Sequence, residues 1–143
     1  HLSIRRQRQM CIRDRRKAED LGTNLIVENM PNPFPFLMKT ASDFDRFYSD
    51  FRSEAPDIAL DIGHAHTSNQ VIKFLDKWRH RIVHIHAHDN YGRSDEHNAI
   101  GHGTVDWQRV ASKLLRLNYN GSVIVESIER VDESLTKIRK LSV

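Results

Sequence analysis

The sequence predicts an α/β fold in which four parallel strands are each followed by a helix. Short apolar, β-branched runs alternate along the chain with segments of helical periodicity. Repeated strand–helix units place their strands parallel, with right-handed crossovers. Each strand-like run ends in a carboxylate or an imidazole, at Glu28, Asp61, His86 and Glu126. Four such units amount to half of a (β/α)8 barrel, in which functional groups lie at the carboxyl ends of the strands.

The individual elements follow from composition and spacing. The expected strands cover residues 24–28, 57–61, 82–88 and 122–126. The expected helices cover residues 43–52, 68–79, 106–117 and 131–141. Ser42 is the expected N-cap of the first of these helices. Its aromatic side chains share one face at helical spacing, which indicates core packing; they are Phe44, Phe47, Tyr48 and Phe51.

Three loops follow the carboxyl ends of expected strands, and one of them covers residues 62–66. Pro31, Pro33 and Pro35 exclude regular structure from residues 29–38. Residues 89–104 are polar, and long loops in compact domains are usually functional or disordered. A doubly wound sheet is the alternative α/β fold, but it would need a glycine-rich turn after its first strand. The proline-rich segment does not supply that turn, and this favours the barrel.

Charge divides the chain into a basic head and a mildly acidic remainder. Six arginines and one aspartate give residues 1–16 a net charge of +5, whereas the whole chain carries +3, so residues 17–143 carry −2. The segment Met10-Cys-Ile-Arg-Asp-Arg15 resembles the in-frame translation of a sequencing adapter. We therefore expect residues 1–16 to be a non-native or disordered head. Residues 17–143 are expected to form one partial TIM-barrel domain.

Composition also restricts the compartment and the partners. The single cysteine, Cys11, excludes an intrachain disulfide framework and fits a reducing compartment. The chain has no apolar run near the ~20 residues that span a bilayer, and no apolar segment follows the basic head as in a secretory signal. A cytoplasmic location and no membrane partner are expected. The acidic balance after residue 16 argues against a nucleic-acid partner.

The residues at the strand ends predict a metal site. If the strands are parallel neighbours, Glu28, Asp61, His86 and Glu126 converge at one edge of the sheet. Three carboxylates so close together repel strongly unless a cation neutralises them. Oxygen ligands with one imidazole suit a divalent ion such as Mn²⁺, Mg²⁺, Co²⁺ or Zn²⁺. One divalent ion is therefore the expected cofactor.

Five motifs in a fixed order resemble the xylose isomerase-like TIM-barrel superfamily. They are Ile26-Val-Glu-Asn29, Leu60-Asp-Ile-Gly-His64, His84-Ile-His-Ala-His-Asp89, Asp95-Glu-His97 with the later Asp106-Trp107, and Ile124-Val-Glu-Ser127. That superfamily contains sugar phosphate isomerases and epimerases, and also endonuclease-IV-type AP endonucleases. The resemblance covers residues 17–143 and implies the C-terminal half of a barrel. An incomplete barrel is also expected to associate with further copies of itself.

In the epimerase branch, the resemblance implies that Glu28, Asp61, His86 and Glu126 bind one metal ion. The two glutamates also act as the acid/base pair on a small sugar substrate, next to a carbonyl that the metal polarises. His64 resembles a residue that contacts a substrate oxygen. The implied enzyme is a sugar or sugar-phosphate isomerase or epimerase.

In the endonuclease branch, the same four residues match zinc ligands together with His64, Asp95 and His97. These three therefore remain either substrate-binding or second-metal residues. A phosphodiesterase acting on abasic DNA is the alternative function, and a non-catalytic metal-binding scaffold is a third hypothesis. His84 and His88 are expected to pack or to support the ligands, and His66 and His102 are expected to be loop residues near the site.

Overall fold

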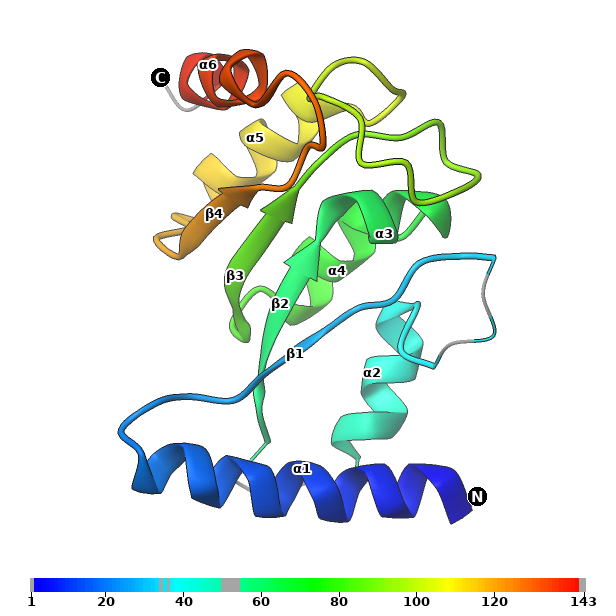
Figure 1. The fold of residues 1–143 in the computed structure, drawn as a ribbon, viewed down its shortest axis with the longest axis vertical. Helices are drawn as coiled ribbons and strands as arrows, with labels where there is room; N and C mark the ends of the chain where they lie inside the picture. Colours follow the sequence, from blue (N-terminus) through cyan, green and yellow to red (C-terminus); the bar gives the residue numbers. More distant parts are fainter. Residues whose placement is uncertain (1, 34, 36, 50–54, 142–143) are drawn as a thin grey trace.

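The computed structural model of the chain describes residues 2–33, 35, 37–49 and 55–141, with side chains from residue 9 onward. Its centre is one sheet of four parallel strands in the order β1-β2-β3-β4. The arrowheads of β2, β3 and β4 all point toward the same end of the molecule (Figure 1). The expected fold of four parallel strands alternating with helices is thereby confirmed. The strands are Ile26–Glu28 (β1), Asp57–Asp61 (β2), Ile82–Ala87 (β3) and Ser122–Val125 (β4).

The strand register brings the predicted site residues to one face of the sheet. Asp61 is the register partner of His86, and His86 is the partner of Ile124. Glu28 is the partner of Ala59, two residues before Asp61. Side chains alternate along a strand, so residues two apart point to the same face. The face that carries Asp61 and His86 therefore also carries Glu28.

Helices cover the opposite face of the sheet and bury the core against it. Helices α4 (Val71–Trp78) and α5 (Trp107–Arg116) lie behind the strands in Figure 1. Helix α2 (Ala41–Tyr48) packs beside α4, where the rings of Phe44 and Phe74 meet edge to face at 5.2 Å. Both rings are fully buried. Burial of such a side chain contributes about 1.5–3 kcal/mol, so this contact anchors the helices to the sheet.

The sheet face that carries the site is open in the described part of the chain. Ile124 is the register partner of His86 and lies on the same face of the sheet, which would line the interior of a complete barrel. Its side chain is nevertheless 47% exposed. The last helix, α6 (Val131–Leu141), has the bounds expected from the sequence. Its Ser134 hydroxyl accepts the Ile100 amide hydrogen at 3.0 Å, which ties α6 to the loop after β3.

The N-cap of α2 differs from the expectation. Thr40, not Ser42, caps the helix: its hydroxyl accepts the Asp43 amide hydrogen at 3.2 Å. The Asp43 carboxylate accepts the Thr40 amide hydrogen at 2.9 Å, which completes a capping box. Thr40 has the extended main chain of an N-cap, whereas Ser42 already lies inside the helix. The expected end of this helix, with Phe51, lies outside the described residues.

The segment after β2 is a helix where the sequence indicated a loop. Helix α3 covers Ile62–Thr67, and α4 begins at Val71 instead of residue 68. The Asp61 carboxylate caps α3 by accepting the His64 amide hydrogen at 2.7 Å. Gly63 is needed here because a Cβ at this position would lie 2.0 Å from Cε1 of His88. A strand-end carboxylate and a close approach thus replace the expected loop by a short helix.

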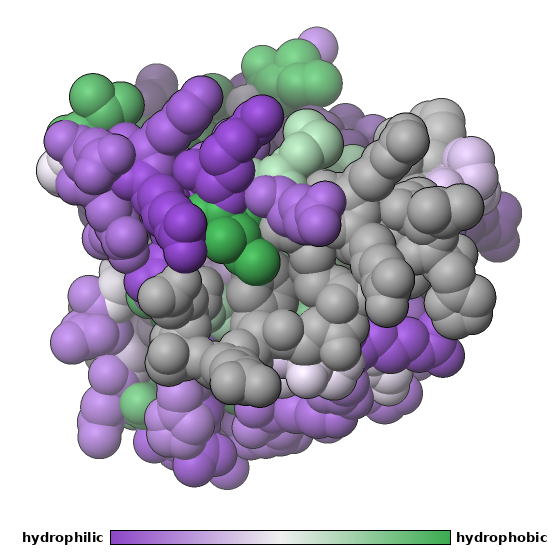
Figure 2. All heavy atoms as spheres, turned by 90° about the horizontal axis from the view of Figure 1, so that it is seen from below, coloured by the Kyte–Doolittle hydropathy of each residue, from purple (hydrophilic) through white to green (hydrophobic). Residues whose placement is uncertain are grey.

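The basic head forms one helix with the residues that follow it, α1 (Leu2–Asp20). This differs from the disordered head that the sequence led us to expect. It lies across the end of the molecule at which the strands begin, away from the site (Figure 1). Seen from that end, the described side chains are mostly hydrophilic (Figure 2). Met10 is 54% exposed, whereas Cys11 packs partly against the core. The non-native origin of residues 1–16 remains a prediction.

The loop between β3 and α5 has little regular structure but is well anchored. Its regular feature among the described residues is an isolated antiparallel bridge between Asp89 and Asn98. Each main-chain nitrogen of the bridge donates to the partner's carbonyl oxygen at 2.8 Å.

Within the part of the chain that the structure describes, no helix combines the length and apolar character needed to cross a membrane.

Candidate metal centre

The four predicted ligands come together at the carboxyl ends of the strands. His86 Nδ1 lies 3.1 Å from Glu28 Oε1, 3.4 Å from Glu126 Oε1 and 3.8 Å from Asp61 Oδ2. Asp61 is fully buried, while His86 and the two glutamates are partly exposed. Three carboxylates around one ring nitrogen need a positive charge among them. Either a proton on His86 or a bound cation supplies it.

Asp61 is held by three neighbouring elements. Its Oδ1 accepts the His64 amide hydrogen of α3 at 2.7 Å, and its carboxylate pairs with His88 Nε2 at 3.1 Å. Its main-chain nitrogen donates to Asn29 Oδ1 at 2.8 Å, and its carbonyl accepts from Asn29 Nδ2 at 3.0 Å. All of Asp61, Asn29 and His88 are inaccessible to solvent. The orientation of this carboxylate is therefore fixed before any ligand binds.

The buried pair of Asp61 and His88 has shifted pKa values. Burial alone would raise the pKa of Asp61, but the hydrogen bond and charge of His88, with His64, outweigh burial and hold that pKa below its ordinary value. Burial likewise opposes the charge of His88, yet Asp61 and Asp95 raise the pKa of its imidazole. Both shifts favour the charged form of the residue concerned in the metal-free protein.

A second group of possible ligands adjoins the first. Ligand atoms of His64, His88, Asp95 and His97 all lie within 4.8 Å of one another. Nε2 of His64 is 3.2 Å and Nε2 of His97 is 3.3 Å from Asp95 Oδ2. The rings of His88 and His97 stack at 3.8 Å. The structure therefore brings together all seven residues that the sequence singled out, in two adjoining groups.

Hydrogen bonding fixes the tautomers of two of these histidines. Nδ1 of His64 lies 2.8 Å from the carbonyl oxygen of Asn29, and Nδ1 of His97 lies 2.8 Å from that of Glu126. A carbonyl oxygen only accepts, so Nδ1 carries the proton in both rings. In the neutral rings, Nε2 then presents a lone pair to the Asp95 carboxylate. This contact is repulsive unless a proton or a cation lies between the atoms.

The donor atoms fit a divalent cation in both groups. Carboxylate oxygens and imidazole nitrogens are the usual ligands of Zn²⁺, Mn²⁺ and Co²⁺. Oδ1 of Asp95 and Nδ1 of His88 are buried, and neither has a hydrogen-bond partner among the described residues. A buried polar atom without a partner is costly, and a cation bound at Asp95 would satisfy its Oδ1.

Asn29, His88 and Asp89 are functional candidates that the sequence either missed or placed only loosely. Asn29 directly follows Glu28, and Asp89 directly follows His88, so both belong to the motifs that carry the resemblance. His88 was expected to pack or to support a ligand, and its pairing with Asp61 agrees with a supporting position. Hydrogen bonds between a side chain and the main chain of another strand leave no pattern in a single sequence. For this reason the sequence did not predict the role of Asn29.

The other histidines of the motifs lie around the centre. His84 pairs with the Ser122 hydroxyl, and its ring lies 5.0 Å from that of His86. His66 Nε2 lies 2.9 Å from the Thr104 hydroxyl, at the far end of the loop after β3. His102 pairs with Glu133 at 3.2 Å on the surface. None of the three belongs to a group of possible metal ligands formed by described residues.

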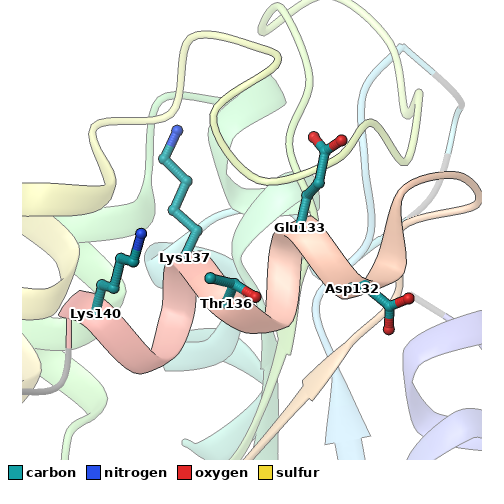
Figure 3. Close-up of a pocket in the computed structure, with 5 residues that line it drawn as sticks. All are labelled: Asp132, Glu133, Thr136, Lys137 and Lys140. Carbon is teal, nitrogen blue, oxygen red and sulfur yellow. The ribbon is translucent and has the colours of Figure 1, made fainter.

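A hollow on the outside of the molecule is distinct from this centre. It runs along α6 and has a volume of about 450 Å³. Glu133, Lys137 and Lys140 extend to the same side of the helix, as Figure 3 shows. All of its lining residues belong to one helix, and none is a predicted site residue. The candidate chemistry therefore lies at the strand ends and not in this hollow.

Fold and site together define half of a (β/α)8 barrel with acidic and imidazole side chains gathered at the carboxyl ends of its strands. The chain belongs to the xylose isomerase-like TIM barrel family, whose model matches residues 7–141. The matched range includes part of the basic head. The expected family is thereby confirmed.

Two curated relatives come from Methanocaldococcus jannaschii. The uncharacterised protein MJ1311 is 37% identical over 113 residues, which are 77% of this chain and 39% of that protein. The uncharacterised protein MJ1614 is 30% identical over 125 residues, which are 86% of this chain and 48% of that protein. The chain thus spans less than half the length of these relatives.

Solved structures of sugar epimerases share the fold. A D-tagatose 3-epimerase-like protein is 35% identical, has a TM-score of 0.77, and is matched over 87% of this chain and 48% of its own. D-allulose 3-epimerase from Methylomonas sp. has a TM-score of 0.76 at 16% identity, over 97% of this chain and 54% of its own. The second likeness shows the fold alone.

Proposed function

We propose that this chain carries half of the active site of a divalent-metal-dependent sugar or sugar-phosphate isomerase or epimerase. The observation that supports this most is the convergence of Glu28, Asp61, His86 and Glu126 around one ring nitrogen. The similarity to a D-tagatose 3-epimerase-like protein at 35% identity supports the same class of substrate. The sugar, the metal and the rest of the site belong to the whole protein and are proposals here.

The geometry suits proton transfer beside a carbonyl. Glu28 ends β1 and Glu126 follows β4, so the two carboxylates approach His86 from opposite edges of the described sheet. One carboxylate removes a proton from the carbon beside the sugar carbonyl, and the other returns a proton on the opposite face. Both glutamates are partly exposed, which leaves them accessible to a substrate.

Asp61 and His86 would hold the cation together with the two glutamates. When bound, the cation supplies Lewis-acid polarisation of the sugar carbonyl. Asp61 serves this end as a fixed charge, because Asn29, His64 and His88 all bind it. Nδ1 of His64 lies 3.5 Å from Glu28 Oε1, and the lone pair on its Nε2 can accept a hydrogen bond from a substrate hydroxyl.

A small neutral or weakly charged substrate agrees with the charge of the described centre. Its ligands include four carboxylates, those of Glu28, Asp61, Asp95 and Glu126. A nucleic-acid enzyme binds through lysine and arginine contacts to phosphates. Residues 17–143 carry a net charge of −2 once the basic head is set aside. This balance favours the sugar substrate over DNA.

A second candidate function rests on the second ligand group. His64, Asp95 and His97 present two imidazole lone pairs and a carboxylate to one another, as a second metal site does. Two or three metal ions are the equipment of a phosphodiesterase that cleaves abasic DNA. The number of metal ions bound per chain distinguishes the two candidate functions: one ion fits the isomerase, and two or three fit the phosphodiesterase.

The test is to load the protein with Mn²⁺, Co²⁺, Mg²⁺ or Zn²⁺ and to measure both bound metal and activity. The proposal expects interconversion of ketoses or ketose phosphates that stops in EDTA and returns with one metal. Metal-dependent cleavage of abasic DNA without any sugar interconversion would establish the second candidate in its place. Mass spectrometry of the washed protein gives the metal-to-chain ratio for either outcome.

A further inference from the structure

The side chain of Asp89 is buried at the centre of the long loop and accepts hydrogen bonds from four donors. Its Oδ1 accepts the amide hydrogens of Asn90 at 2.9 Å and Val105 at 3.1 Å. Its Oδ2 accepts the amide hydrogen of Gly101 at 2.8 Å and the indole hydrogen of Trp107 at 2.9 Å. The exposed fraction of Asp89 is 0%. One carboxylate thus joins the start, middle and end of the loop to the first residue of α5.

The chain closes tightly around this carboxylate. Asp89 also forms the two main-chain hydrogen bonds of the bridge to Asn98, each 2.8 Å long. A Cβ at Gly103 would lie 2.3 Å from Asp89 Oδ1, so only glycine permits the approach. The loop therefore folds back on Asp89 from two directions.

Asp95 and His97 lie within the segment that these contacts enclose. The intervening Glu96 carboxylate accepts the Tyr91 amide hydrogen at 3.0 Å and a side-chain hydrogen of Asn98 at 3.1 Å. His97 has a positive φ of 51°, a conformation that costs free energy for a residue with a side chain. Such a conformation persists where surrounding contacts impose it.

We propose that Asp89 is a positioning residue, which holds Asp95 and His97 at the centre by fixing the loop. Asp89 directly follows His88, but its carboxylate binds only donors of the loop and of α5, and it acts through the position of the loop. A carboxylate is required because both of its oxygens accept two hydrogen bonds, and every partner is an N–H donor. An asparagine of the same shape would turn an NH2 group toward two of those donors, which would then have no acceptor.

Two imidazole hydrogens provide a direct reading of this role in the metal-free protein. The Nδ1 hydrogen of His97 binds the Glu126 carbonyl at 2.8 Å, so it depends on the position of the loop. His64 lies on α3, and its Nδ1 hydrogen binds the carbonyl oxygen of Asn29 at 2.8 Å. This hydrogen bond involves no main-chain atom of the loop. Both should give slowly exchanging imidazole signals in spectra of the protein labelled with ¹⁵N-histidine. His97→Gln and His64→Gln assign them.

The experiment compares Asp89→Asn with Asp106→Asn, recorded in EDTA. The substitution at Asp106 is the same chemical change at the other end of the loop. The exposed Asp106 carboxylate only caps α5. We expect Asp89→Asn to abolish the His97 signal and to keep the His64 signal, whereas Asp106→Asn keeps both. Retention of the His97 signal in Asp89→Asn would overturn the proposal, and so would loss of both signals in a variant that remains folded.

If Asp89→Asn does not fold, Trp107→Phe removes one donor and leaves the carboxylate. The Nδ1 hydrogen of His97 should then exchange with solvent roughly 5-fold faster, because the contacts that hold the loop lose one hydrogen bond. An unchanged exchange rate would contradict the positioning role. Exchange at His64 is the internal reference in both variants.

The importance of this positioning role rests on the proposed function. Titration with Co²⁺ shows which of the two has failed if a result is negative. If His97 contributes to metal binding, Asp89→Asn should weaken Co²⁺ binding by about 10- to 100-fold. Loss of the His97 signal with unchanged Co²⁺ affinity would keep the positioning role and count against a metal role for His97. Failure of ketose interconversion in the unmodified protein would leave the two imidazole signals, and thus the inference, intact.

Discussion

The side-chain amide of Asn29 forms two hydrogen bonds with the main chain of Asp61, as one more pair of strand residues would. Asn29 Oδ1 accepts the Asp61 amide hydrogen at 2.8 Å, and Asn29 Nδ2 donates to the Asp61 carbonyl at 3.0 Å. Both residues are inaccessible to solvent. The contact extends the pairing of β1 with β2 beyond Glu28, and it keeps two carboxylates of the centre at a fixed separation.

Substitution Asn29→Ala should therefore destabilise the metal-free protein. It leaves a buried amide hydrogen and a buried carbonyl of Asp61 without partners, at a cost of about 1–3 kcal/mol each. We expect a loss of about 2–4 kcal/mol in the free energy of unfolding, measured with urea. Asn120→Ala is the matched control because Asn120 is exposed, and it should change stability by less than about 0.5 kcal/mol. Equal effects of the two substitutions would contradict the role of Asn29.

The capping box of α2 gives a second prediction about stability. Thr40→Ala removes the hydroxyl that accepts from Asp43 and should cost about 1 kcal/mol. Ser42→Ala should cost less than about 0.5 kcal/mol, since Ser42 is exposed and lies inside the helix. Thermal unfolding of both variants decides between the two residues. A larger loss at Ser42 would restore the helix start that the sequence alone suggested.

The Asp61–His88 pair predicts how stability depends on pH. The raised pKa of His88 contributes stability that is fully present below its ordinary value of 6.5 and is lost as pH rises through the folded-state pKa. The lowered pKa of Asp61 contributes stability that is present above 3.8 and is lost as pH falls through its folded-state pKa. The pair therefore stabilises the protein most between these two values.

In EDTA, His88→Gln should lower the free energy of unfolding by about 1.5–3 kcal/mol near pH 5–6, as for a hydrogen bond to a charged group. The difference from the unmodified protein should shrink as pH rises above the His88 pKa. His80→Gln, at an exposed position, is the control and should leave the profile unchanged. A difference that stays constant from pH 5 to 9 would mean that the charge of His88 does not stabilise Asp61.

Glu126→Gln tests a residue with two proposed roles. It removes a charged oxygen ligand and a proton-transfer group together, so both metal affinity and turnover should fall. Loss of the proton-transfer group alone should reduce the rate of sugar interconversion by roughly 10²–10⁴-fold. Glu129→Gln, three residues later and exposed, should keep both properties. Full activity of Glu126→Gln at saturating metal would exclude Glu126 as an acid or base.

Periodicity and strand ends sufficed to predict the sheet and the side chains that meet at its edge. The bounds of β2 agree with the expected residues 57–61, because an apolar run of three residues lies between two aspartates. Glu28, Asp61 and His86 were expected to meet because parallel strands end at one edge, and their atoms do lie together. Alternation along the strands decides this geometry, and alternation is visible in the sequence.

The features that the sequence did not reveal depend on contacts between distant segments. Helix α3 has a local cap in Asp61, but its close approach to His88 at Gly63 joins residues that lie 25 positions apart. Asp89 lies in a motif, but its donors come from as far as Trp107. Side-chain bonds to main-chain groups across a loop have no period. They therefore become visible only when the fold is known.

The most direct test of the central claim is to follow deuterium from solvent into the sugar. The protein, loaded with Co²⁺ or Mn²⁺, is incubated in D2O with ketoses and ketose phosphates, and mass spectrometry measures the label. Our account predicts deuterium at the carbon beside the carbonyl, with no label in EDTA and a roughly 10²–10⁴-fold slower gain in Glu126→Gln. Absence of label in every sugar, with metal bound and abasic DNA cleaved, would contradict it.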